Sequence, residues 1–134
     1  MVYLLDTCTV SDFVKGEPNT LSHLKSVSPS LVSISVLTLM EIRYGMAINP
    51  QRVAKIRQVI EDFLISVTII PFAEKEAEEA ALIRSILKTQ GNPISSYDLL
   101  IAATAKKHHL KLITSNINEF NRISGLEIEN WRQN

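Results

Sequence analysis

Cysteine is almost absent from this chain of 134 residues, and neither sign of charge prevails. Because Cys8 is the only cysteine, no disulfide can form within the chain, which fits a reducing compartment. Lysine plus arginine and aspartate plus glutamate each number 14, so the formal net charge is +0. Non-specific nucleic-acid binders are usually strongly basic, so any contact with nucleic acid is expected to use a local patch.

Long apolar runs and phosphate-binding glycine loops are also missing. The longest apolar runs, LISVTIIPFA and LLIAATA, are far shorter than the roughly 20 residues of a membrane helix. The start of the chain has no basic run, so we expect no signal peptide and a cytoplasmic protein. The four glycines match neither GxxxxGK[ST] nor GxGxxG. Zinc is disfavoured, because His108 and His109 are adjacent and cannot face one site together on a helix.

Apolar residues make up 46% of the chain, and strand and helix signals alternate along it. Strand signals occupy 2–5, 31–35, 67–72 and 111–114, with a further segment, LEIEN, at 126–130. Helical signals occupy 9–28 (broken at Gly16 and Pro18), 36–47, 50–64, 73–90 and 96–109, with a short turn or helix at 117–121. The alternation predicts one domain over residues 1–134, an α/β fold with a mainly parallel central sheet between two helix layers.

Two polar residues stand where ligands bind in such sheets, at the carboxyl ends of strands. Asp6 follows the strand VYLL, and Asn116 follows the strand KLIT. Asp98 shares a helix face with apolar residues, where an acid is costly unless it is paired or binds a metal. Structural roles also remain open: Asp6 as a helix N-cap, Asp98 in a capping box with Ser95, and Asn116 as a turn residue.

Glu41 raises a similar question on the next predicted helix. It projects between Leu37 and Tyr44, away from any polar face, and the structural alternative is a buried salt bridge with Arg43 or Lys15. Glu119 has a simpler alternative as a solvated helix residue. Cys8 is interpreted as a small buried side chain and not as a nucleophile.

Taken together, Asp6, Glu41, Asp98 and Asn116 are expected to converge on one edge of the sheet. Carboxylates gathered without a cation repel one another and acquire raised pKa values. Oxygen ligands without a set of histidines or cysteines favour Mg²⁺ or Mn²⁺. The sequence therefore predicts a site for a hard divalent cation.

Four segments carry a family resemblance that covers nearly the whole chain. They are YLLDTCTVSDFVKG, SISVLTLMEIRYG, NPISSYDLLIAATAKKHHLKLITSN and NEFNRISGLEIENW. In this order they resemble PIN-domain proteins and, among them, the VapC ribonuclease toxins of bacterial toxin–antitoxin pairs.

The resemblance implies a PIN-like fold and a metal-dependent endoribonuclease that hydrolyses phosphodiester bonds of RNA. Asp6, Glu41 and Asp98 would hold Mg²⁺ or Mn²⁺, and Asn116 stands where many relatives have a fourth acid. One branch carries this Asn with a Glu three residues later, here Glu119. A single tightly held ion with a second ion recruited by the substrate fits this set. Thr7, Ser115 and Glu119 are expected to support the site.

The resemblance also implies partners: a structured RNA such as tRNA, a small VapB-type antitoxin that blocks the acidic site, and a second copy in a homodimer. Basic residues expected near the RNA backbone are Lys15, Arg43, Lys106 and Lys107. A catalytically degenerate PIN domain that only binds RNA or protein is the main alternative. A phosphoryl-accepting receiver domain is disfavoured, because Asp6 has no second acid beside it before Asp12.

Overall fold

The computed structural model describes residues 1–133 and contains one five-stranded sheet in which every pairing is parallel. The strands are β1 (Tyr3–Leu5), β2 (Val32–Ser35), β3 (Thr68–Ile70), β4 (Lys111–Ile113) and β5 (Ile128–Glu129), in the spatial order β3-β2-β1-β4-β5. The predicted parallel α/β sheet is therefore confirmed. Since β1 lies between β2 and β4, the strand order changes direction between β1 and β4, where such sheets bind ligands.

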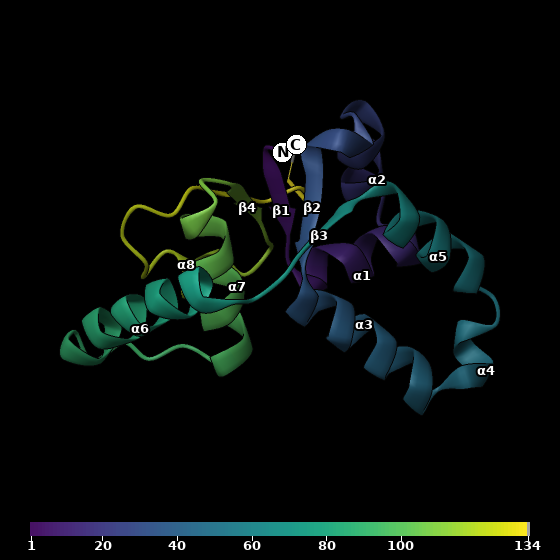
Figure 1. The fold of residues 1–134 in the computed structure, drawn as a ribbon. Helices are drawn as coiled ribbons and strands as arrows, with labels where there is room; N and C mark the ends of the chain where they lie inside the picture. The colour runs from purple at the N-terminus through teal and green to yellow at the C-terminus, as the bar shows by residue number, and fades with distance from the viewer. Residues whose placement is uncertain (134) are drawn as a thin grey trace.

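Helices cover both faces of the sheet (Figure 1). One face carries α1 (Thr7–Lys15), α2 (Pro18–Ser26), α3 (Val36–Ile48), α4 (Pro50–Val53) and α5 (Arg57–Ser66). The other carries α6 (Glu74–Thr89), α7 (Ser96–Lys107) and α8 (Ile117–Phe120), and a short 3-10 turn, η1 (Pro29–Leu31), precedes β2. The structure therefore has the three layers that the sequence predicts.

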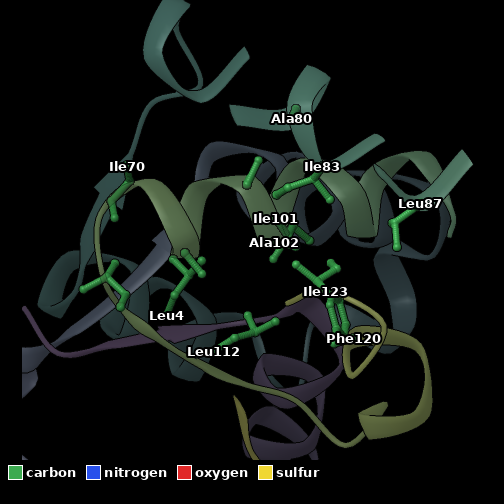
Figure 2. Close-up of a cluster of buried hydrophobic side chains, with 13 residues drawn as sticks. Leu4, Ile70, Ala80, Ile83, Leu87, Ile101, Ala102, Leu112, Phe120 and Ile123 are labelled. Atoms are coloured by element: carbon green, nitrogen blue, oxygen red, sulfur yellow. The ribbon is translucent and has the colours of Figure 1, made fainter. Parts of the chain in front are cut away.

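Alternate residues of the inner strands supply the two cores. Leu4 and Leu112 are fully buried and point toward α7 and α6, where Ile101 and Ile83 meet them (Figure 2). Their neighbours along the strands belong to the opposite core, because successive strand side chains point to opposite faces. The buried sheet holds both helix layers, and with them the residues at its carboxyl edge.

Two predicted helices are divided in the structure. The pattern at 9–28 forms two helices, because Gly16 ends α1 with a left-handed φ of 81° and Pro18 begins α2 at its first position. The pattern at 50–64 is broken by a turn at 54–56, which no glycine or proline marks. None of the helices among residues 1–133 is long and apolar enough to cross a membrane.

Candidate active site

Asp6 ends the central strand and begins a helix. Its backbone N–H donates to the carbonyl of Ile113 at 3.0 Å, and its Oδ1 accepts from the backbone N–H of Thr9 at 2.8 Å. The N-cap role considered for Asp6 is therefore present. Only 3% of the residue is exposed. Burial raises the pKa of the Asp6 carboxyl, and hydrogen bonds from Thr114 and Thr9 offset only part of that rise.

Residues after β4 connect Asp6 to the next acid. The hydroxyl of buried Thr114 lowers the pKa of the Asp6 carboxyl and accepts from the backbone N–H of Asn116 at 2.9 Å. The amide Nδ2 of Asn116 then donates to Oε2 of Glu119 at 2.7 Å. Ser115 lies between these residues and is half-buried. The sequence analysis missed Thr114, although its position directly after KLI marked it as a strand-end residue.

Asp98 and Glu119 form a carboxyl pair at the start of α7. Glu119 Oε1 accepts from the backbone N–H of Ser95 at 3.0 Å, and Ser95 Oγ accepts from the backbone N–H of Asp98 at 3.4 Å. Burial, together with the neighbouring Glu119, raises the pKa of Asp98 to about 6. The hydrogen bond from Ser95, and those from Asn116 and Asp98, lower the pKa of Glu119.

The two carboxyls therefore titrate as a coupled pair, in which the pKa of Asp98 is raised and that of Glu119 is lowered. The interpretation of Glu119 as a merely solvated residue was wrong, because its carboxylate accepts hydrogen bonds from Ser95 and Asn116.

Glu41 enters from α3, the helix that follows β2. Its Oε1 accepts from the hydroxyl of Thr7 at 2.8 Å. The alternative salt bridge with Arg43 was wrong, because Arg43 pairs with Glu61 on α5. An ion pair between Glu41 and Lys15 is likewise absent from the described part of the chain.

Cys8 lies among these acids. Contrary to the sequence interpretation, the residue is exposed. Partial burial of the thiol raises its pKa, and the nearby carboxylates of Asp6, Asp98, Asp12 and Glu41 raise it further. The thiol therefore stays protonated, which makes it a poor nucleophile.

Asp12 differs from the other acids near the site because its carboxylate is paired with a cation. The guanidinium of Arg132 binds it with two hydrogen bonds, Nε to Oδ2 at 2.7 Å and Nη2 to Oδ1 at 2.8 Å. The sequence did not reveal this pair, because its members are far apart along the chain. With its carboxylate neutralised, Asp12 is a less suitable cation ligand than Asp6, Glu41 or Asp98.

The chemistry of the acidic residues fits a hard cation. They offer carboxylate oxygens, and the pKa values of Asp6 and Asp98 are raised by burial and by nearby acids, a penalty that a divalent cation removes. Across residues 1–133 no three His, Cys, Asp or Glu side chains converge closely enough to hold an ion as they stand. Glu41 instead accepts a hydrogen bond from Thr7, while Thr114 and Glu119 shift the pKa values of Asp6 and Asp98.

The four predicted RNA contacts are not brought together. Lys15 ends α1 and lines the same groove as Thr7 and Glu41. Arg43 is paired with Glu61. Lys106 and Lys107 end α7, roughly 12 Å along the helix from Asp98, toward the amino edge of the sheet. Lys106 also lies 3.8 Å from a carboxylate oxygen of Glu79.

Comparison with known proteins identifies relatives over the full length. The family model described as "PIN domain" matches residues 3–126. The tRNA(fMet)-specific endonuclease VapC of Salmonella typhimurium is 32% identical, with 96% of this chain and 97% of the relative covered. Toxin FitB of Neisseria gonorrhoeae is 34% identical, with coverages of 87% and 89%.

Solved structures agree with these relatives. DNA-bound VapBC from Salmonella typhimurium superposes with a TM-score of 0.88 at 31% identity, covering 98% of each chain. The FitAcB structure from Neisseria gonorrhoeae also gives a TM-score of 0.88, at 29% identity, covering 99% of this chain and 100% of the other.

Proposed function

The chain belongs to the PIN-domain family, in the group of VapC ribonuclease toxins, and on that premise we propose that it hydrolyses RNA phosphodiester bonds at Asp6, Glu41 and Asp98. The observation that carries the proposal is that Asp6, Thr114, Asn116, Glu119 and Asp98 follow one another in space. Hydrogen bonds join Thr114 to Asn116 at 2.9 Å and Asn116 to Glu119 at 2.7 Å, while Thr114 shifts the pKa of Asp6 and Glu119 shifts that of Asp98. This arrangement unites the ends of β1 and β4 with the start of α7. If each of these residues served only as a local helix cap or turn residue, the others would not need to lie beside it.

Asp6, Asp98 and Glu41 are the residues that would hold Mg²⁺ or Mn²⁺. When bound, such an ion neutralises charge on the scissile phosphate and makes water a better nucleophile. The chain itself orients the ligands: the Thr9 N–H and Thr114 fix Asp6, and Thr7 fixes Glu41. Asp98 must lose its proton before both its oxygens can serve as ligands, and its pKa of about 6 permits this at neutral pH.

Asn116 and Glu119 complete the acidic edge. Asn116 adds no charge, but its amide Nδ2 donates a hydrogen bond to Oε2 of Glu119 at 2.7 Å. Glu119 therefore supplies the carboxylate that an acid at position 116 would otherwise supply. We infer that Asn116 is a positioning residue and that Glu119 assists Asp98. We also propose Ser115 as a supporting residue, because it lies between Thr114 and Asn116.

The relatives support the choice of substrate and partner. The Salmonella protein is named as specific for tRNA(fMet), which makes a structured RNA such as tRNA the first substrate to test. One related solved structure is described as a toxin–antitoxin complex and another as a member of the VapBC family of toxin–antitoxin systems, which favours a small antitoxin as the regulator of this chain. We also propose a homodimer and a cytoplasmic site of action, where tRNA resides.

The purified chain should cleave tRNA in Mg²⁺ or Mn²⁺ and stop in EDTA. The variants Asp6→Asn and Asp98→Asn should each lose at least about 100-fold in cleavage rate, because each removes a charged ligand. Gel analysis of tRNA incubated with each protein, with and without chelator, measures the rates.

A matched control is Asp62→Asn. Asp62 lies on α5, where it accepts a hydrogen bond from Gln58 at 2.8 Å, away from the site. This variant should cleave like the wild type. Cleavage that persists in EDTA, or in the Asp6 or Asp98 variant, would refute the cation mechanism. Binding of RNA without any cleavage would favour the degenerate domain.

A further inference from the structure

A groove of about 520 Å³ adjoins the acidic site and runs between α1, α3 and the α4–α5 segment. Thr7 and Glu41, which share a hydrogen bond of 2.8 Å, line the groove and also belong to the acidic edge. Aliphatic side chains such as Val10, Ile42 and Met46 line much of the rest. A polymer lying in the groove would therefore pass directly beside Glu41.

Three cations line this groove: Lys15, Arg52 and Lys55. All three are exposed, and none forms an ion pair within residues 1–133. By contrast, Arg43 and Lys106 each lie against a glutamate. Among residues 1–133 the only acid lining the groove is Glu41, so the groove is positively charged in a chain whose net charge is zero.

We propose that this groove binds the single-stranded RNA segment next to the scissile bond, with Lys15, Arg52 and Lys55 contacting successive phosphates. The inference rests on the proposed nuclease function. An uncompensated positive groove attracts a polyanion and delivers it to the neighbouring acidic edge. No aromatic side chain lines the groove in the described chain, so binding depends on phosphates and tolerates different base sequences.

The test uses a fluorescein-labelled RNA of 12 mixed nucleotides, with binding followed by fluorescence anisotropy in EDTA so that no cleavage occurs. The double variant Arg52→Gln/Lys55→Gln should raise Kd about 10-fold at low salt. It should also lower the slope of log Kd against log salt concentration by about 1.4, since each lost phosphate contact contributes about 0.7.

A control of equal charge is Lys25→Gln/Lys75→Gln, whose lysines are exposed on α2 and α6 and do not line the groove. The control should keep the wild-type Kd and slope. If the groove variant binds the oligonucleotide as the control does, the assignment is overturned and the groove is left for an apolar peptide. Cleavage of tRNA by the wild type in Mn²⁺ reports separately on the nuclease function.

Discussion

Asp98 binds a proton more tightly than an ordinary aspartate does. Its pKa of about 6 results first from burial and then from the carboxylate of Glu119 beside it. In the unfolded chain the pKa of an aspartate is about 3.9. The folded state therefore binds this proton more tightly than the unfolded state. It follows that ionisation of Asp98 opposes folding, and that this cost appears as the pH rises from about 4 through 6.

The variant Asp98→Asn should be more stable than the wild type at pH 7.5, even as cleavage is lost. The amide cannot ionise and can still donate a hydrogen bond to Glu119. Because Asp98 is only half-buried, solvent screening reduces the expected gain to about 1 kcal/mol. The gain should be mostly lost near pH 4, where the folded carboxyl is protonated and the unfolded carboxyl is about half protonated. Urea unfolding in EDTA at the two pH values measures it.

Asp62→Asn again serves as the control and should change stability by less than about 0.5 kcal/mol at either pH. A gain for Asp98→Asn that is the same at pH 4 and 7.5 would show that it does not arise from the carboxyl proton.

At the residue scale, the sequence predicted which residues lie at strand ends but not which side chains they contact. The sequence placed Asp6 and Asn116 at the carboxyl ends of parallel strands, and the structure has them there. Their catalytic role stays a prediction. The sequence could not show that Glu119 would lie close enough to Asp98 to raise its pKa, because that placement depends on the turn between β4 and α8. The exposure of Cys8 was missed for a similar reason, since it depends on what surrounds the start of α1.

At the scale of elements, the segment after β5 secures α1. Trp131 is 2% exposed, stacks on His23 with ring centroids 5.5 Å apart, and meets Tyr3 of β1 edge-on at 5.5 Å. The next residue, Arg132, holds Asp12 with two hydrogen bonds. Since Asp12 is on the helix that Asp6 caps, this contact fixes the helix that carries the first acid.

Replacing Arg132 by alanine should cost about 1–2 kcal/mol in the free energy of unfolding, because Asp12 is then left buried without its cation. The expected loss of stability is this small because the Arg132 side chain is 52% exposed, so solvent screens the ion pair. Urea unfolding of Arg132→Ala, Asp12→Asn and the double variant gives the coupling energy, expected near 1 kcal/mol.

Arg43→Ala is the matched control, since the pair between Arg43 and Glu61 lies at the surface and should contribute at most about 0.5 kcal/mol. Equal losses for Arg43→Ala and Arg132→Ala would contradict the special role assigned to the buried acid.

Helix positions were easier to predict than helix boundaries. Gly16 and Pro18 indicated an interruption, and the structure forms two helices there. The break at 54–56 lacks such a signal, and tertiary packing decides it: Val53 and Ile60 are both buried in the same core on either side of the turn.

At the scale of the whole molecule, binding of a cation at the proposed site should stabilise the fold. A ligand that binds only the native state adds RT ln(1 + [L]/Kd), or about 1.4 kcal/mol at ten times Kd. For a chain of this size that corresponds to a rise in Tm of about 3–5 °C. A thermal scan in Mn²⁺ against EDTA measures it.

The variant Asp6→Asn should lose most of the Mn²⁺-dependent rise, and Asp62→Asn should keep it. A rise of equal size in both variants would place the ion elsewhere on the molecule.

The central strand gives the molecule a particular order of assembly. Tyr3 of β1 pairs with Val32 on one side but with Lys111 on the other. At about 5 to 20 residues per second, the ribosome synthesises Lys111 roughly 4 to 16 seconds after Val32. During that interval Asp6 has been synthesised, yet Thr114, Asn116 and Glu119 do not exist. The proposed acidic site therefore cannot form until nearly all of the sheet has been translated, and a nascent chain of this topology should not cleave RNA before then.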